Sequence, residues 1–279
     1  MVRSTFRELQ AEWTPPLRGV GVPHPDWSNG SSSLLEYGTK LVGTGEGFWQ
    51  VVLYPDAGEA GAVFHSARTT KRGGGPEADP DDAARVATRR AKSKVRRYCA
   101  SNRLTRFGTL THAGEGCWDP LELRREMALF FRRLRTEVGK PYPYVWVGEW
   151  HKSHGLHAHY AMGRFVRRRA IDEAWGRGYI KIKLHGDLPY ASTALVEARH
   201  TARYLSKYMT KSVEEVAAGL HRYEVGQGFQ PTSAGFKGRS SGEVLGWAAD
   251  QMGGSPDFVK PSSEWEHYLG PPAVFASWT

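Results

Sequence analysis

The chain has 279 residues, of which 40% are hydrophobic, enough for one substantial globular core with appendages. Its formal net charge of +9 favours a polyanionic partner, although a merely basic surface would give the same value. Cys99 and Cys117 make no disulfide framework, no apolar run approaches the roughly 20 residues of a membrane span, and no secretion signal opens the chain, so we expect a cytoplasmic protein without a membrane partner.

The first 82 residues are interpreted as an N-terminal hairpin region and linker. Residues 1–31 are polar and broken by prolines, which predicts irregular structure. Two apolar runs, 34–42 and 48–54, are separated by three glycines and are expected to pair as a hairpin. Residues 66–82 have the Gly- and Pro-rich composition of a linker. Their glycines lack the Gly-Lys-Ser/Thr ending of a P-loop, which is missing from the whole chain, so no nucleotide cofactor is expected.

A strongly basic helix is predicted to begin after Asp82 and to run to about Ala100. It contains seven arginines and lysines and no acidic residue. Such a charge run is usually a solvated helix face, but the absence of compensating acids favours contact with a phosphate backbone. The predicted DNA-binding residues are Arg89, Arg90, Arg96 and Arg97.

Alternating helices and strands follow over residues 83–215. Strands are predicted at 107–112, 144–150, 156–162 and 179–184, and helices at 120–138, 167–175 and 193–211. This order predicts an α+β fold, in which helices flank a central antiparallel sheet of the ferredoxin-like or RRM-like kind. Residues 216–279 are rich in Gly, Ser, Pro and Trp, and are expected to form an irregular C-terminal extension with one short helix at 242–252.

A pair of histidines on one predicted strand suggests a metal site. Side chains alternate along a strand, so His157 and His159 project to the same face. Glu149 ends the preceding strand, where a hairpin would bring it close, and His151 and His154 are rival third ligands. Two imidazoles and a carboxylate would accept a divalent metal such as Mg²⁺ or Mn²⁺ and leave positions open for water and phosphate. A chance His-x-His pair is the structural alternative.

Two tyrosines on the last predicted helix have the spacing of a common face. Tyr204 and Tyr208 are four residues apart, and each is followed three residues later by a lysine, Lys207 or Lys211. Tyrosines at this spacing are usually packing residues. A nearby ammonium, however, favours tyrosinate and neutralises a phosphate oxygen. A metal site beside such a helix is what metal-assisted attack of tyrosine on a phosphodiester requires.

Together these motifs resemble the HUH endonucleases, specifically the two-tyrosine rolling-circle replication initiators of phages and plasmids. The segment 107–111 resembles their first motif, 157–159 their His-hydrophobe-His motif, and 204–211 their Tyr-x-x-x-Tyr motif. The resemblance covers about residues 85–215 and implies a five-stranded sheet with the metal site on it. It also implies strand-specific nicking and joining of DNA through a 5′-phosphotyrosine. The implied partners are single-stranded or origin hairpin DNA and, because the chain lacks a P-loop, a host helicase.

Two other interpretations remain open from the sequence. A HUH transposase or relaxase shares the chemistry, although relaxases resemble a permuted version in which the tyrosine precedes the histidines. An RRM-like module that binds single-stranded nucleic acid without chemistry would also explain the basic helix and the aromatic residues.

Overall fold

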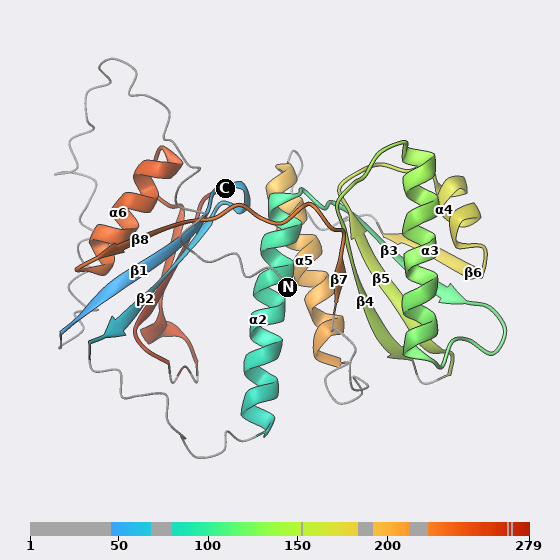
Figure 1. The fold of residues 1–279 in the computed structure, drawn as a ribbon, viewed down its shortest axis with the longest axis horizontal. Coiled ribbons are helices and arrows are strands. Elements are labelled where there is room, and N and C mark those ends of the chain that lie inside the picture. Colours follow the sequence, from blue (N-terminus) through green and yellow to red (C-terminus); the bar gives the residue numbers. More distant parts are fainter. Residues whose placement is uncertain are drawn as a thin grey trace, which may run out of the picture.

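The computed structural model describes residues 46–67, 80–151, 153–183, 192–211, 223–266, 268 and 270–279, with the backbone alone for 80–83, 210 and 211. These residues form two five-stranded antiparallel sheets and five α-helices (Figure 1). The sheets lie on opposite sides of the molecule, and helices α2 (Pro80–Ser101) and α5 (Ala194–Lys211) stand between them (Figure 1). The predicted α+β fold class is confirmed.

Sheet B contains the histidine motif and has the strand order β6-β3-β5-β4-β7. Its strands are β3 (Arg106–His112), β4 (Tyr144–His151), β5 (Gly155–Met162), β6 (Gly178–Lys183) and β7 (Glu224–Val225). The central strand β5 pairs on both sides, so His159 lies opposite Thr109 of β3 and opposite Val147 of β4. The four predicted strands of this segment are confirmed to within one residue at the ends that the structure describes.

The two faces of sheet B are covered by different helices. Leu156, Ala158, Tyr160 and Met162 face a core shared with α3 (Pro120–Val138) and α4 (Arg168–Trp175). Alternate side chains of the same strand, including Ala161, face a second core shared with α2 and α5. Because β5 has period two, His157 and His159 project to the α2 and α5 side.

Helix α3 begins and ends as its sequence predicts. The Asp119 side chain accepts a hydrogen bond from the Leu121 backbone N–H at 2.8 Å, with Pro120 at the first helical position. Gly139 then ends the helix with a positive φ of 76°, a conformation that glycine adopts without a Cβ penalty. The capped helix packs the apolar stripe of its inward face against the core of sheet B.

Sheet A has the order β8-β1-β2-β10-β9 and combines strands from before and after the segment of sheet B. Its strands are β1 (Gly47–Tyr54), β2 (Glu59–Ser66), β8 (Ala234–Gly238), β9 (Phe258–Pro261) and β10 (Ala273–Ser277). Short 3₁₀ turns η1 (Pro55–Ala57) and η2 (Ser262–Glu264) lie before β2 and after β9. Helix α6 (Ser241–Met252) covers one face of the sheet, and the short helix predicted at 242–252 is thereby confirmed.

Two predictions about the ends of the chain are wrong. Strand β1 was expected to pair with residues 34–42, which lie outside the described residues, but both of its edges are occupied by β2 and β8. The C-terminal segment was expected to be irregular, yet it supplies three strands of sheet A and helix α6. Its strands are short and contain glycines, so their period-two pattern is weak until they pair with β1 and β2.

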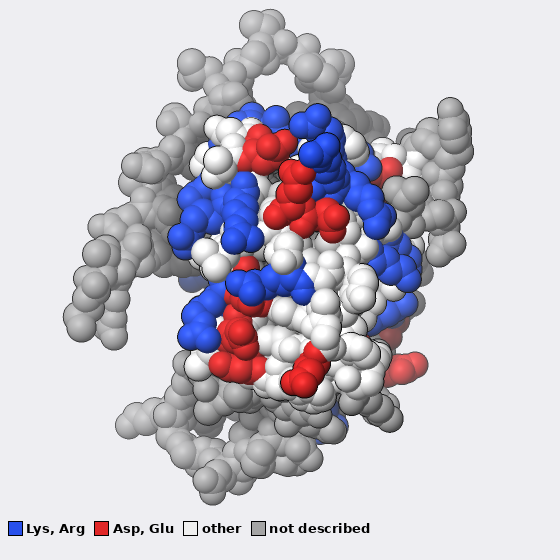
Figure 2. All heavy atoms as spheres, turned by 90° about the vertical axis from the view of Figure 1, so that its right-hand side faces the viewer, with Lys and Arg blue, Asp and Glu red and all other residues white. Residues whose placement is uncertain are grey.

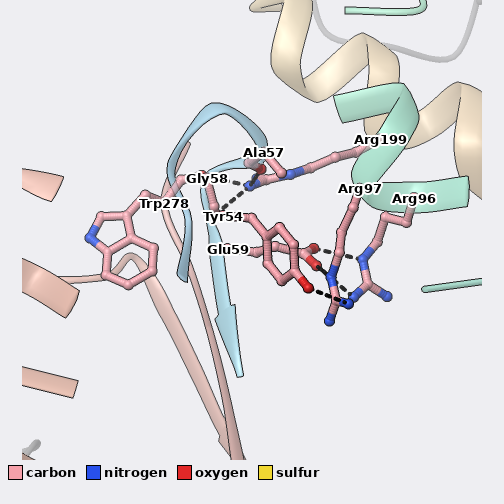
Figure 3. Close-up of polar contacts among 8 residues, drawn as sticks. All are labelled: Tyr54, Ala57, Gly58, Glu59, Arg96, Arg97, Arg199 and Trp278. Atoms are coloured by element: carbon pink, nitrogen blue, oxygen red, sulfur yellow. Dashed lines mark hydrogen bonds and ion pairs between the residues drawn. The ribbon is translucent and has the colours of Figure 1, made fainter. Parts of the chain in front are cut away.

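Sheet A is joined to the central helices by a set of arginines (Figure 3). Glu59, which is 1% exposed, accepts hydrogen bonds from Arg96 Nε at 2.7 Å and from Arg97 Nε at 2.6 Å. Arg199 of α5 donates to the backbone carbonyls of Ala57, Gly58 and Trp278 at 2.7–2.9 Å. We call this set, comprising Glu59, Arg96, Arg97 and Arg199, the arginine latch. It connects α2 and α5 to both ends of sheet A's sequence.

None of the described helices combines the length and the apolar character that crossing a membrane requires.

Candidate active site

His159 is the centre of the predicted metal site and has partners on both ring nitrogens. Its Nε2 lies 2.7 Å from Glu149 Oε2, and its Nδ1 lies 3.0 Å from the Thr109 hydroxyl. An imidazole protonated on Nε2 donates to the carboxylate and accepts from the hydroxyl at Nδ1. The side chain is only 4% exposed, so both contacts are shielded from bulk water. The structure therefore brings Glu149 to His159, as the predicted hairpin requires.

His157 lies beside this pair and keeps one nitrogen without a partner. In register, it is directly opposite Glu149 on β4. Its Nε2 is buried and has no hydrogen-bond partner, and its ring stacks on His151 at 4.9 Å between centroids. Burial, reinforced by the neighbouring His151 and His159, holds the pKa of His157 below its usual range. The neutral imidazole is the form that ligates a metal, so this side chain fits the predicted role.

The rival ligands belong to the same cluster. The Ser153 hydroxyl lies 3.1 Å from His151 Nδ1 and 2.9 Å from His154 Nδ1 in the turn between β4 and β5. Among the residues that the structure describes, no three His, Cys, Asp or Glu side chains already form a metal cage. The reason in this cluster is direct, because Glu149 and His159 use their ligating atoms to bond each other. The identity of the third ligand stays a prediction.

Helix α5 presents both tyrosines to the histidine face of sheet B. The Tyr208 ring stacks on the His159 ring at 3.5 Å between centroids and 12° between planes. Tyr204 meets Phe107 edge-on at 4.8 Å, and the two tyrosine rings are 5.5 Å apart. Their hydroxyls share a hydrogen bond. The first, second and third sequence motifs therefore meet at one place.

The two phenols have opposite electrostatic environments. The hydrogen bond from Tyr208 and the ammonium of Lys183 lower the pKa of Tyr204, which is the less buried of the two. Burial raises the pKa of Tyr208, and its bond to Tyr204 reinforces that shift. Tyr208 is thus the donor and Tyr204 the acceptor, and the tyrosinate form is favoured at Tyr204.

Lys183 is a site residue that the sequence did not indicate. Its Nζ lies 3.8 Å from the centre of the Tyr204 ring, whereas Nζ of the predicted Lys207 lies 5.3 Å away. The predicted Lys211 occupies the last position of α5, but its side chain is outside the described part of the chain. Lys183 ends β6 opposite Phe107 of β3. Only the pairing of β6 with β3 reveals this position, because the residue is twenty-one positions from Tyr204 in sequence.

The four predicted DNA-binding arginines divide into two pairs. Arg89 and Arg90 are exposed on α2. Arg96 and Arg97 belong instead to the arginine latch, where they hold Glu59 (Figure 3). At the other end of the molecule, around α3 and α4, positive and negative side chains are interleaved (Figure 2). The pairs Arg167–Glu137 and Arg169–Glu173 lie there, so basic residues near α4 are partly neutralised.

Comparison with known proteins identifies the family of this segment. Residues 105–213 match the model of the family described as replication-associated protein ORF2. Comparison with curated proteins and with solved structures found no significant match. The matched segment includes the Thr109 strand, the histidine pair and the tyrosine helix, whose side chains the structure assembles into one site. Over residues 105–213, the chain therefore belongs to the replication-associated protein ORF2 family, in agreement with its resemblance to HUH-type phage initiators.

Proposed function

We propose that the protein is a metal-dependent, strand-specific DNA nicking and joining enzyme that initiates rolling-circle replication. The observation that carries this proposal is the stack of Tyr208 on His159, which holds a hydrogen-bonded pair of tyrosine hydroxyls against the histidine cluster. A core tyrosine used only for packing has no need of a second phenol, an ammonium and an imidazole around it. Membership of the replication-associated family supports the same assignment.

In the proposed reaction, Tyr204 is the first nucleophile. Its oxygen attacks the scissile phosphorus, the bond from phosphorus to the 3′ oxygen breaks, and the released 3′ oxygen takes up a proton. The products are a 5′-phosphotyrosine and a 3′-OH that primes synthesis. A divalent ion such as Mg²⁺ or Mn²⁺, held by His157, His159 and Glu149, would polarise the phosphate.

The surrounding residues prepare the nucleophile. Lys183 and the Tyr208 hydroxyl stabilise negative charge on the Tyr204 oxygen. Lys207, which is exposed on the same helix, is placed to neutralise a phosphate oxygen, and we retain Lys211 in the same role as a proposal. Attack of a 3′-OH on the phosphotyrosine reverses the first step and joins DNA. Joining therefore conserves the phosphodiester bond and requires no nucleotide cofactor.

Two tyrosines allow two successive cleavages. After one round of synthesis, Tyr204 still carries the DNA 5′ end, and a second cut needs another nucleophile. Tyr208 is in contact with Tyr204, so it can take this role once covalent attachment has removed the Tyr204 oxyanion. Origin DNA, in single-stranded or hairpin form, is the proposed substrate, and a host helicase is the proposed partner that opens the duplex.

The test is covalent capture from a library of single-stranded DNA. The protein is incubated with random-sequence strands and Mn²⁺, denatured in detergent, and the DNA that remains attached is sequenced from its 5′ end. We expect attached strands that begin at a common sequence, and none with the Tyr204→Phe, Tyr208→Phe double variant. Tight binding without any detergent-resistant adduct would favour the non-catalytic RRM-like module instead.

A further inference from the structure

We propose that the face of sheet A opposite α6 is a second binding site, and that its ligand is single-stranded DNA. This face consists of alternate residues of β8, β1, β2, β10 and β9, which all lie outside the segment that matches the family. We call it the open face. The inference rests on the proposed function only in taking DNA as the substrate, since no residue of the active site contributes to it.

The period-two alternation of the strands defines the open face. Trp49, Val51 and Leu53 of β1 pack against α6, so Phe48, Gln50 and Val52 project to the other side. On β8, Phe236 stacks on Trp247 of α6 at 5.4 Å, which places the neighbouring Lys237 on the open face. The registers of the remaining strands continue the same division.

The centre of the open face is flat, and aromatic rings surround it. A Cβ added to Gly61 would meet no heavy atom of the described residues within 4 Å, so these residues leave the middle of the sheet uncovered. Phe48 is 37% exposed and stacks with His65 at 5.0 Å, while Phe258 is 50% exposed and lies 6.4 Å from Phe275. Large apolar rings left in water on two sides of a flat centre are suited to stacking with a planar ligand.

Cations accompany these rings. Lys237 Nζ lies 4.9 Å from the centre of the Phe48 ring, and the Arg96 guanidinium lies 5.2 Å from that of Phe275. Lys260 of β9 is directly opposite Phe275 in register. The acidic side chain on the described strands of this face is Glu59, which Arg96 and Arg97 already neutralise. The open face therefore has a surplus of positive charge beside its aromatic residues.

Helix α2 extends the positive charge beyond the sheet. Arg89 and Arg96 are seven residues apart and lie on the same side of the helix. Arg89 is close enough to Tyr268, between η2 and β10, for its charge to oppose the rise in the pKa of that phenol that burial causes. The exposed Arg89 thus lies near the β10 side of sheet A, and the predicted DNA contact of α2 and the open face form one surface.

The combination selects single strands rather than duplexes. Unpaired bases can stack on exposed aromatic rings while lysines and arginines contact the phosphates, whereas a duplex keeps its bases stacked inside. A flat sheet face also admits a strand of any sequence, because every base offers a π-face. We therefore assign to the open face a sequence-tolerant role, holding the strand whose cleavage takes place on sheet B.

The first test measures the salt dependence of binding. Fluorescence anisotropy with labelled oligothymidine is carried out in the Tyr204→Phe, Tyr208→Phe background, which cannot form the proposed adduct. Lys237→Gln with Lys260→Gln should weaken binding and lower the slope of log K against log salt by about 1.4, at about 0.7 per lost contact to a single strand. The matched control, Arg132→Gln with Lys140→Gln, removes two exposed charges near α3 and should leave the slope unchanged.

The second test separates stacking from charge. Phe48→Leu keeps an apolar side chain at an exposed position but removes the ring, and should weaken binding by roughly fivefold or more. Phe48→Trp should retain the affinity. Equal salt slopes for the lysine pair and its control, or equal affinities for the leucine and tryptophan variants, would overturn the inference. So would an equal loss with a duplex probe, because the site would then not select single strands.

A separate assay keeps this inference distinct from the proposed function. With both tyrosines present, the Lys237→Gln, Lys260→Gln chain should still form the covalent adduct at saturating DNA. If the unsubstituted chain forms no adduct, the nicking proposal fails while the anisotropy result stands. If the adduct forms and the anisotropy slopes do not differ, only the open-face site is refuted.

Discussion

At the scale of single residues, His159 is held more firmly than any other side chain of the proposed metal site. Glu149 and Thr109 bond its two nitrogens, Tyr208 stacks on its ring at 3.5 Å, and Phe107 lies nearly parallel to it at 6.1 Å. A ligand already fixed in orientation loses little freedom when a metal binds. The contact from Thr109 therefore has a function beyond packing, since it orients the ring from behind.

Replacing Thr109 by Val should lower the affinity for Mn²⁺ by about 10- to 100-fold, because the ring loses its orienting hydroxyl. The affinity can be measured by the electron paramagnetic resonance signal of free Mn²⁺, without reference to activity. Thr111→Val is the matched control, since Thr111 lies two residues along the same strand and pairs with Tyr179 of β6 rather than with His159. Equal Mn²⁺ affinities for the two variants would refute the orienting role.

Lys183→Ala should slow adduct formation and move its pH dependence upward. The pKa of Tyr204 is held below its usual range by the Tyr208 hydroxyl and then by Lys183, so loss of the ammonium raises it. Each unit of increase removes about tenfold of the tyrosinate at a pH well below the pKa. The rate should therefore continue to rise at higher pH than in the unsubstituted chain. Lys207→Ala, with its ammonium farther from the ring, should shift the profile less.

The tyrosines themselves should divide the reaction between them. Tyr204→Phe and Tyr208→Phe should each retain some single-step nicking, while the double variant forms no adduct. Mass spectrometry of the DNA-linked peptide should place the first adduct on Tyr204, and closed single-stranded circles should form best with both tyrosines present. Adducts found only on Tyr208, with normal circle formation by Tyr204→Phe, would make Tyr204 a packing residue.

At the scale of elements, the arginine latch determines how α2 and sheet A hold together. Glu59 is buried, and burial alone would raise the pKa of its carboxyl, but Arg96 and Arg97 more than offset this and hold the pKa below the ordinary 4.5. A depressed folded-state pKa stabilises the fold above the unfolded-state value. That stabilisation is lost as the pH falls below 4.5 and passes through the folded-state pKa.

Glu59→Gln should therefore destabilise the protein by about 1–3 kcal/mol at neutral pH, the cost of a lost charge-assisted hydrogen bond. We place the expected value toward the low end, because the two arginines are partly exposed and water can solvate them. Urea unfolding at several pH values measures the effect. The difference from the unsubstituted chain should be constant above pH 4.5 and should shrink below it; a difference that is independent of pH would exclude the latch as its source.

The elements also show which features a sequence reveals. Sheet B was predictable because its strands and helices have clear periods, and because the Asp119 cap and Gly139 stop mark helix α3. The site was predictable where the signal is local, as in the pair His157 and His159. Lys183 was not, because only the pairing of β6 with β3 brings it to Tyr204. Strand β2 was missed for a similar reason, since its alanines and glycine form a strand only when β1 and β10 pair with it.

At the scale of the whole molecule, α5 serves both sheets. Its tyrosines lie on sheet B, while Arg199, less than two turns earlier, bonds three carbonyls at one end of sheet A. The helix that carries the proposed nucleophiles is thus also anchored to the sheet that carries the open face. Movement of one sheet relative to the other would strain this helix.

Arg199→Met should separate the stability of the two sheets without removing a residue of the active site. The variant keeps the length of the side chain but cannot donate to the carbonyls of Ala57, Gly58 and Trp278. We expect faster protease cleavage within sheet A, and adduct formation reduced by less than about tenfold. A single cooperative transition with unchanged proteolysis would show that the other contacts suffice to couple the sheets.

The pairing of Trp49 with Gly238 also determines when the protein can be completed during synthesis. Strands β1 and β2 leave the ribosome first, but their neighbours β8, β10 and β9 are translated only after the entire segment that matches the replication family. The nascent hairpin must therefore wait with both edges unpaired while sheet B assembles behind it. A chain released early, after Lys211, would have its nucleophile helix but would lack three strands of sheet A, so a ribosome that stalls late in the message would release a product with exposed sheet edges.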